Sequence, residues 1–134
     1  MSAHQARQSR RRKAPDLEIA SRERAEPFTT KDGSTIRVLL DARHGGAANQ
    51  SLAEATLAPG QATQRHYHAD TEEIYVVLAG AGQMEVDGER SRVGPGDAIL
   101  IPPGAWHEIG AGADELRFLC CCAPPYADED TYFE

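Results

Sequence analysis

Cysteine is scarce in this sequence, and its placement excludes a disulfide framework. The three cysteines lie side by side at Cys120, Cys121 and Cys122, so they cannot link distant segments, and they lack the spacing of a CxxC metal site. We expect reduced thiols that pack in the interior. The sequence also lacks an apolar run of membrane-spanning length and the apolar core of a signal peptide. No membrane partner is expected, and a cytoplasmic protein is the simplest interpretation.

Acidic residues are missing from residues 1–15, which contain five lysines or arginines, whereas the rest of the chain has 9 basic and 21 acidic residues. This segment has no apolar periodicity and is predicted to be a disordered basic tail. A basic arm can bind nucleic acid or an anionic membrane. A solvated leader is favoured instead, because no aromatic residues are interleaved for base stacking. Nucleic acid is therefore not an expected partner.

The sequence also lacks a long amphipathic segment with helical periodicity. Its 12 glycines and 8 prolines separate short apolar runs across 134 residues, which is typical of a single all-β sandwich or barrel. We expect one barrel domain over residues 16–126, followed by an acidic surface tail over residues 127–134. The predicted strands cover residues 35–40, 51–58, 74–78, 83–86, 98–101, 106–109 and 116–122, with a type I′ hairpin turn at Asp87-Gly88.

The segment from Gly60 to Gly80 contains the most specific chemistry. His66 and His68 are one residue apart, so in a strand both imidazoles leave the same face as a pair of potential metal ligands. Glu73 follows at the start of an apolar strand, and a hairpin would fold its carboxylate back onto the histidines. Glu72 is adjacent, but strand parity favours Glu73 and leaves Glu72 as a solvated charge at the rim.

A second segment, Gly96 to His107, supplies a third imidazole. Pro102, Pro103 and Gly104 end one strand, and His107 begins the next. Three imidazoles and one carboxylate suit a divalent transition metal, and Fe, Mn, Ni, Zn and Cu all remain open. Metal occupancy should fall as the pH drops through the histidine range, because protons compete for the same lone pairs.

The spacing of these residues resembles that of the cupin superfamily. Its two motifs are met by Gly60, His66, His68, Glu73 and Gly80, and by Gly96, Pro102, Gly104 and His107. The second motif usually continues with an asparagine, which is Ala111 here. The resemblance implies a small single-domain jelly-roll barrel, the double-stranded β-helix, with a metal centre formed by His66, His68, Glu73 and His107. The spacing of the turns independently supports such a barrel.

Function follows less directly, because cupins include dioxygenases, decarboxylases, isomerases, lyases and non-enzymatic binding proteins. The resemblance favours a metal-dependent enzyme that acts on a small polar metabolite. The alternative is a non-catalytic cupin that binds a metal or a small molecule. Tyr75 lies on the face of Glu73 and is a candidate catalytic hydroxyl, although packing is the commoner role. Arg37, Arg43 and His44 are candidate rim contacts.

The face opposite Glu73 predicts an interface. Ile74, Val76 and Leu78 alternate with the ligand side of their strand, and with the strand at residues 35–40 they are candidates for a surface that a second copy covers. They could instead pack beneath the second sheet. Trp106 has the opposite parity to His107 and should face away from the metal. We expect a homodimer.

Overall fold

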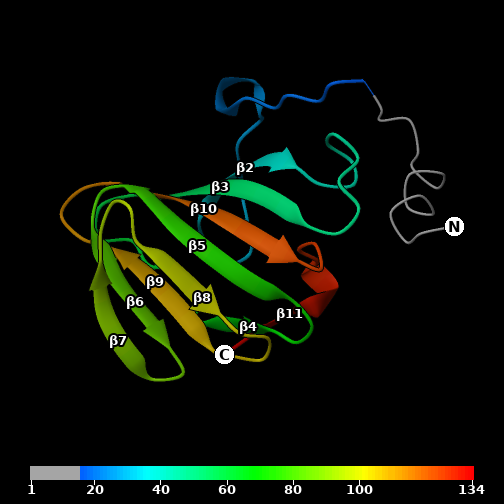
Figure 1. Ribbon diagram of the computed structural model, residues 1–134. Coiled ribbons are helices and arrows are strands. Elements are labelled where there is room, and N and C mark those ends of the chain that lie inside the picture. The colour runs from blue at the N-terminus through cyan, green and yellow to red at the C-terminus, as the bar shows by residue number, and fades with distance from the viewer. Residues whose placement is uncertain (1–15) are drawn as a thin grey trace, which may run out of the picture.

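Two antiparallel β-sheets face each other and enclose the core (Figure 1). The structure is a computed structural model that describes residues 16–134, so the basic tail predicted for residues 1–15 lies outside the described residues. Nearly all regular elements are strands, and two short 3-10 turns, η1 (Arg22–Arg24) and η2 (Asp128–Asp130), complete them. The predicted all-β jelly-roll fold is confirmed. Within residues 16–134, no helix has both the length and the apolar character needed to cross a membrane.

The larger sheet has six strands, and a strand from the C-terminal part of the sequence lies near its centre. In spatial order these are β1 (Phe28–Thr29), β2 (Thr35–Leu40), β3 (Ser51–Leu57), β10 (Leu116–Ala123), β5 (Glu72–Ala79) and β8 (Ala98–Ile101). Strand β10 forms antiparallel pairs with both β3 and β5. The alternation of each strand turns one row of side chains toward the smaller sheet and the other outward.

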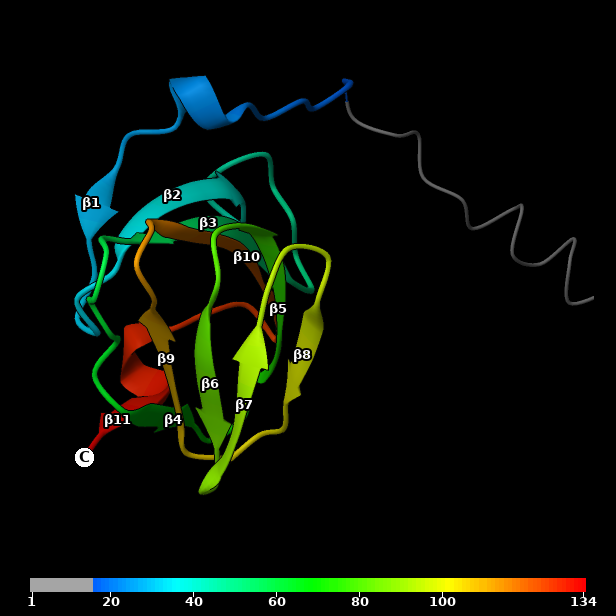
Figure 2. The same cartoon turned by 90° about the vertical axis from the view of Figure 1, so that its left-hand side faces the viewer.

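The smaller sheet has five strands and contains the histidines. In spatial order these are β11 (Thr131–Phe133), β4 (His66–His68), β9 (His107–Ala111), β6 (Gly82–Val86) and β7 (Glu89–Val93). Figure 2 shows this order across the sheet. Strands β6 and β7 form the predicted hairpin, since Asp87 (φ 48°) and Gly88 (φ 87°) both have the positive φ that a type I′ turn requires.

The hairpin predicted between the histidine pair and Glu73 is not formed. Strand β4 pairs with β9 and β11 in the smaller sheet, whereas β5 pairs with β10 and β8 in the larger one. The physical reason is that β5 finds a longer partner in β10, which pairs with it from Glu72 to Ala79 with one register shift. Residues 69–71 cross from one sheet to the other, so Glu73 reaches the histidines across the interior of the barrel.

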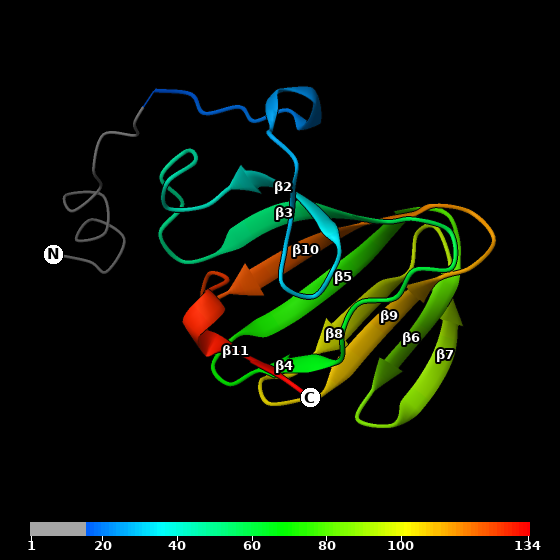
Figure 3. The ribbon, with the colours of Figure 1, turned by 180° about the vertical axis from the view of Figure 1, so that it is seen from behind.

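The acidic C-terminal segment, expected as a surface tail, forms η2 and β11, which adds an edge strand beside β4 (Figure 3). The Asp130 carboxylate accepts hydrogen bonds from the backbone N–H groups of Asp70 and Thr71. Arg65 pairs with both Glu85 and Glu134. The acidic side chains therefore attach this segment to the barrel through defined partners.

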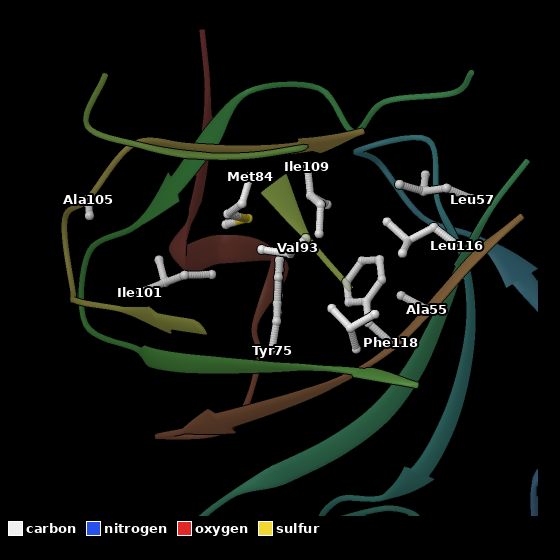
Figure 4. Close-up of a cluster of buried hydrophobic side chains, with 11 residues drawn as sticks. Ala55, Leu57, Tyr75, Met84, Val93, Ile101, Ala105, Ile109, Leu116 and Phe118 are labelled. Atoms are coloured by element: carbon white, nitrogen blue, oxygen red, sulfur yellow. The ribbon is translucent and has the colours of Figure 1, made fainter. Parts of the chain in front are cut away.

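The apolar core lies between the sheets and is composed of alternating inward-facing residues (Figure 4). Its largest members are Leu57, Tyr75, Met84, Ile101, Ile109, Leu116 and Phe118. Close packing also explains Gly80, the last glycine of the first motif. A Cβ at this position would lie 2.1 Å from the carbonyl oxygen of Glu115, and the φ of +80° disfavours any other residue.

Candidate metal centre

The structure brings His66, His68, Glu73 and His107 together in the interior. His66 and His107 are directly opposite each other on β4 and β9, and His68 lies two residues further along the same face of β4. Their potential ligand nitrogens all lie within 4.8 Å of one another. The Oε1 atom of Glu73 is 3.4 Å from His68 Nε2 and 3.5 Å from His107 Nε2. All four residues are buried.

Backbone carbonyls orient two of the imidazoles. His66 Nδ1 lies 2.7 Å from the Gln64 carbonyl oxygen, and His107 Nδ1 lies 2.9 Å from that of Ala105. A carbonyl oxygen only accepts hydrogen bonds, so each Nδ1 carries the proton and donates it. In the neutral ring, Nε2 then keeps its lone pair and faces the centre. This is the tautomer that a metal ligand needs.

Thr131 orients the third imidazole from β11. Its hydroxyl donates to the Ala127 carbonyl oxygen at 3.0 Å, so the hydroxyl oxygen accepts from His68 Nδ1 at 3.1 Å. In its neutral form, His68 therefore also presents the Nε2 lone pair to the centre. The C-terminal strand thus supports a residue of the first motif that lies 63 positions earlier in the chain.

Glu73 has two oxygens with different surroundings. Its Oε2 accepts a hydrogen bond from the Cys122 thiol at 3.1 Å. Its Oε1, like His107 Nε2, is buried and has no hydrogen-bond partner among the described residues. Leaving a buried polar atom unpaired costs about 1–3 kcal/mol. A divalent cation bound by three nitrogen lone pairs and one carboxylate oxygen would satisfy both atoms, so the residues present fit a metal ion.

The protonation states agree with this arrangement. Burial and the neighbouring His107 imidazole lower the pKa of His66 to about 4, so this ring is neutral at pH 7. Burial acts to raise the pKa of Glu73, but the imidazoles of His107 and His68 outweigh it and lower that pKa to about 2. The centre therefore offers a carboxylate and at least one neutral imidazole at physiological pH.

The second motif is held against the first by a backbone hydrogen bond. The Gly104 N–H donates to the His68 carbonyl oxygen at 2.7 Å, and Gly104 has a φ of +80°. Only glycine adopts this left-handed conformation at little cost. The turn at residues 102–105 therefore sets the position at which β9 begins, and with it the place of His107 opposite His66.

A cavity of about 110 Å³ lies beside the centre. Residues of β1, β2, β3, β5 and β10 line it together with the C-terminal segment, and His66, His68 and Glu73 form part of its wall. Tyr75 and Cys120 also line it. Burial, followed by the charge of Glu73, raises the pKa of both groups well above the ordinary range. The phenol and the thiol therefore stay protonated at neutral pH.

Other residues considered from the sequence lie elsewhere. Arg37 donates to the backbone carbonyls of Arg22 and Ala25, and Arg43, His44 and Glu72 are exposed. None of these side chains lines the cavity. Trp106 faces away from the centre, as its parity predicts, and its ring packs against Tyr67 and Arg65.

Three residues at this site were not singled out from the sequence as site residues. Thr131 orients His68, the Cys122 thiol binds Glu73, and Asp32 lines the cavity from the turn between β1 and β2. For Cys122 the sequence favoured interior packing, and for Asp32 it predicted a place in a turn. No local spacing connects any of them to the histidine motif. Their contacts depend on how distant strands are placed side by side.

Replacing Thr131 by valine should weaken metal binding. Valine preserves the shape of threonine but removes the oxygen that accepts from His68 Nδ1, so that ring loses its fixed orientation. Removing such a supporting contact typically lowers metal affinity about 10–100-fold. Competition with a fluorescent zinc chelator measures the change. Thr131→Ser retains the hydroxyl and serves as the control, and equal affinities for the two variants would contradict this role of Thr131.

Comparisons with known proteins identify the family of this chain. Residues 53–122 match the family described as cupin domain. An uncharacterized protein of Methanocaldococcus jannaschii is 46% identical over 110 residues, which cover 81% of this chain and 88% of that protein. A 5-aminosalicylate 1,2-dioxygenase of Comamonas is 40% identical over 63 residues, or 46% of this chain and 17% of the enzyme. The polyketide cyclase RemF of Streptomyces resistomycificus superposes with a TM-score of 0.70 at 26% identity, covering 85% of this chain and 89% of RemF. The chain belongs to the cupin family.

Proposed function

We propose that this protein is a metal-dependent cupin enzyme that converts a small metabolite. His66, His68, Glu73 and His107 bind one divalent transition metal in this proposal. The observation that carries it is the pair of buried, unpartnered atoms, Glu73 Oε1 and His107 Nε2, beside the lone pairs of the other two imidazoles. Iron, manganese, nickel, zinc and copper are all compatible with three nitrogen ligands and one oxygen ligand.

The chain itself prepares the reaction in several ways. A bound metal would supply a Lewis acid or an oxygen-activating centre. The Gln64 and Ala105 carbonyls and the Thr131 hydroxyl hold the imidazoles in their ligand orientation. Apolar walls such as Phe118 limit the water around the substrate. Tyr75 stays protonated, so we propose that its hydroxyl donates a hydrogen bond to the substrate rather than acting as a base.

The similar proteins support an enzyme more than a storage protein. One similar chain is named as a dioxygenase and another as a polyketide cyclase, so related barrels serve in more than one reaction type. We assign the class as dioxygenase, isomerase, lyase or decarboxylase without choosing among them. The three free cysteines are consistent with the reducing cytoplasm, where we place the protein.

The test combines metal analysis with a turnover screen. Protein purified without a nickel column should contain close to one divalent metal per chain, and the protein reloaded with that metal should turn over at least one member of a metabolite panel. Tyr75→Phe should retain the metal and lose turnover. A metal-free protein would contradict the proposed centre. A metal-loaded protein that binds panel members without converting them would instead establish a non-catalytic binding cupin.

The outer face of the larger sheet leads to a prediction about assembly. Leu100, Leu78 and Ile74 are 57%, 38% and 37% exposed, and Ile74 and Leu100 are opposite each other on β5 and β8. A second copy would bury these side chains, so light scattering should report about twice the chain mass of 14.5 kDa. Leu100→Arg should give monomers. Glu89→Gln on the exposed strand β7 changes the charge equally and should remain dimeric; a monomeric parent protein would contradict the prediction.

A further inference from the structure

The cavity beside the proposed metal centre has acidic side chains and lacks basic ones. Asp32, Asp41 and Glu73 contribute carboxylates, whereas no lysine or arginine belongs to the described residues that line it. The remaining wall is mostly apolar or aromatic and includes Phe28 and Phe118. A site built for a carboxylate or phosphate usually presents an arginine or a lysine to it. Here that partner is missing from the lining.

Four arginines near the barrel are committed to other contacts, namely Arg22, Arg37, Arg65 and Arg117. Arg22 and Arg117 both pair with Glu54 on the outer side of the larger sheet. Arg65 pairs with Glu85 and Glu134, and Arg37 donates to two backbone carbonyls. Moving any of them into the cavity would break these contacts. These four arginines therefore do not supply a positive charge to the cavity wall.

Asp32 is held rigidly at the cavity. Its Oδ1 atom accepts hydrogen bonds from the Ser34 backbone N–H at 2.9 Å and from the Ser34 hydroxyl at 2.6 Å. Its backbone carbonyl accepts from the Gln64 N–H at 2.8 Å, and the Gln64 carbonyl in turn orients His66. Among residues 16–134, all hydrogen bonds to this carboxylate go to Oδ1. Its Oδ2 remains available to accept from a ligand.

We infer that the cavity selects an uncharged or cationic ligand, which donates a hydroxyl or amino hydrogen to Asp32 and places an apolar ring against the aromatic wall. The inference rests on the proposed function, because it takes the metal centre as the floor of the binding site. The carboxylates of Asp32, Asp41 and Glu73 carry three negative charges, so a divalent metal would leave one of them unbalanced. A carboxylate or phosphate placed against Asp32 is disfavoured, because a fixed like charge in a poorly solvated cavity repels it. Size sets a second limit, because a cavity of roughly 150 Å³ already holds a benzene ring. The volume of about 110 Å³ therefore admits at most about one ring, with the rest of the ligand outside.

A matched pair of probes tests this selectivity. 2-Hydroxybenzyl alcohol and salicylate have the same ring and phenol, and they differ in whether a neutral hydroxymethyl or a carboxylate is attached. The zinc-loaded full chain is titrated with each probe and followed by calorimetry or ligand-observed NMR, so the readout is independent of turnover. The alcohol should bind at least tenfold more tightly than salicylate. Asp32→Asn should reduce this ratio about tenfold.

Two controls separate the possible failures. Asp32→Asn retains an oxygen that can accept from Ser34, and its zinc content shows whether the centre is intact. Asp97→Asn makes the same change at a turn carboxylate that accepts from Gly94 outside the cavity, and it should leave the ratio unchanged. Equal or tighter binding of salicylate by the parent protein overturns the inference, as does an unchanged ratio in Asp32→Asn or the failure of both probes to bind. A protein that binds zinc and turns over an anionic metabolite would retain the proposed function while refuting this selectivity.

Discussion

Replacing His66 and His68 together by alanine is expected to abolish metal binding. The double variant removes two of the three imidazoles, so only Glu73 and His107 remain of the four proposed ligands, and they come from opposite sheets. Two ligands cannot compensate for the dehydration of a divalent ion as four can, so occupancy should fall from about one metal per chain to less than a tenth. Elemental analysis after dialysis against the metal measures this loss.

Loss of folding must be separated from loss of ligands. His66→Gln with His68→Gln keeps more of the buried volume and should lose the metal equally, while its circular dichroism stays that of the parent protein. His44→Ala is the matched control, because this exposed histidine contacts Asp41, and neither residue is one of the four proposed ligands. Full metal occupancy in either double variant would show that these two histidines are not ligands.

The stability of the chelator-treated protein should decrease as the pH falls from about 6.5 to about 4. Burial lowers the pKa of His66 to about 4 in the folded chain from 6.5, so the unfolded chain binds more protons in this window. The contribution of neutral His66 is therefore complete above pH 6.5 and is lost toward pH 4. A shift of this size corresponds to at most about 3 kcal/mol. Urea unfolding at a series of pH values measures it.

A second decrease is expected at lower pH. The pKa of Glu73 is lowered from 4.5 to about 2, so its contribution is present above pH 4.5 and is lost as the pH falls toward 2. His66→Gln should flatten the dependence between pH 6.5 and 4 and leave the lower window intact. Equal stability of the metal-free parent protein at pH 6.5 and pH 4 would contradict the shift at His66. Competition between protons and metal at His66 should likewise begin near pH 4, below the ordinary histidine range.

Local spacing was sufficient to predict the parts of the site that depend on strand parity. His66 and His68 share a face because they are one residue apart, and the turn at Asp87-Gly88 forms because both residues accept positive φ. The same parity correctly pointed the side chain of Glu73 inward. It could not show that β5 belongs to the other sheet, because pairing partners are chosen by strands far away in the sequence.

The supporting contacts were beyond local spacing for the same reason. Thr131 reaches His68 across 63 positions, and Cys122 reaches Glu73 across 49. An acidic composition made the C-terminal residues resemble a solvated tail, yet Asp130 accepts from backbone N–H groups that follow β4. Composition describes the average solubility of a segment, whereas these individual hydrogen bonds depend on the assembled sheets.

The position of β10 determines the order in which the protein can mature during synthesis. This strand lies between β3 and β5, so the larger sheet cannot close until residues 116–123 have left the ribosome. Thr131 emerges later still, so His68 gains its hydrogen-bond partner only after residue 131 has left the ribosome. Until then the nascent chain exposes two unpaired strand edges and loosely oriented histidines. The support of the histidine pair is therefore complete only once β11 has emerged and paired with β4.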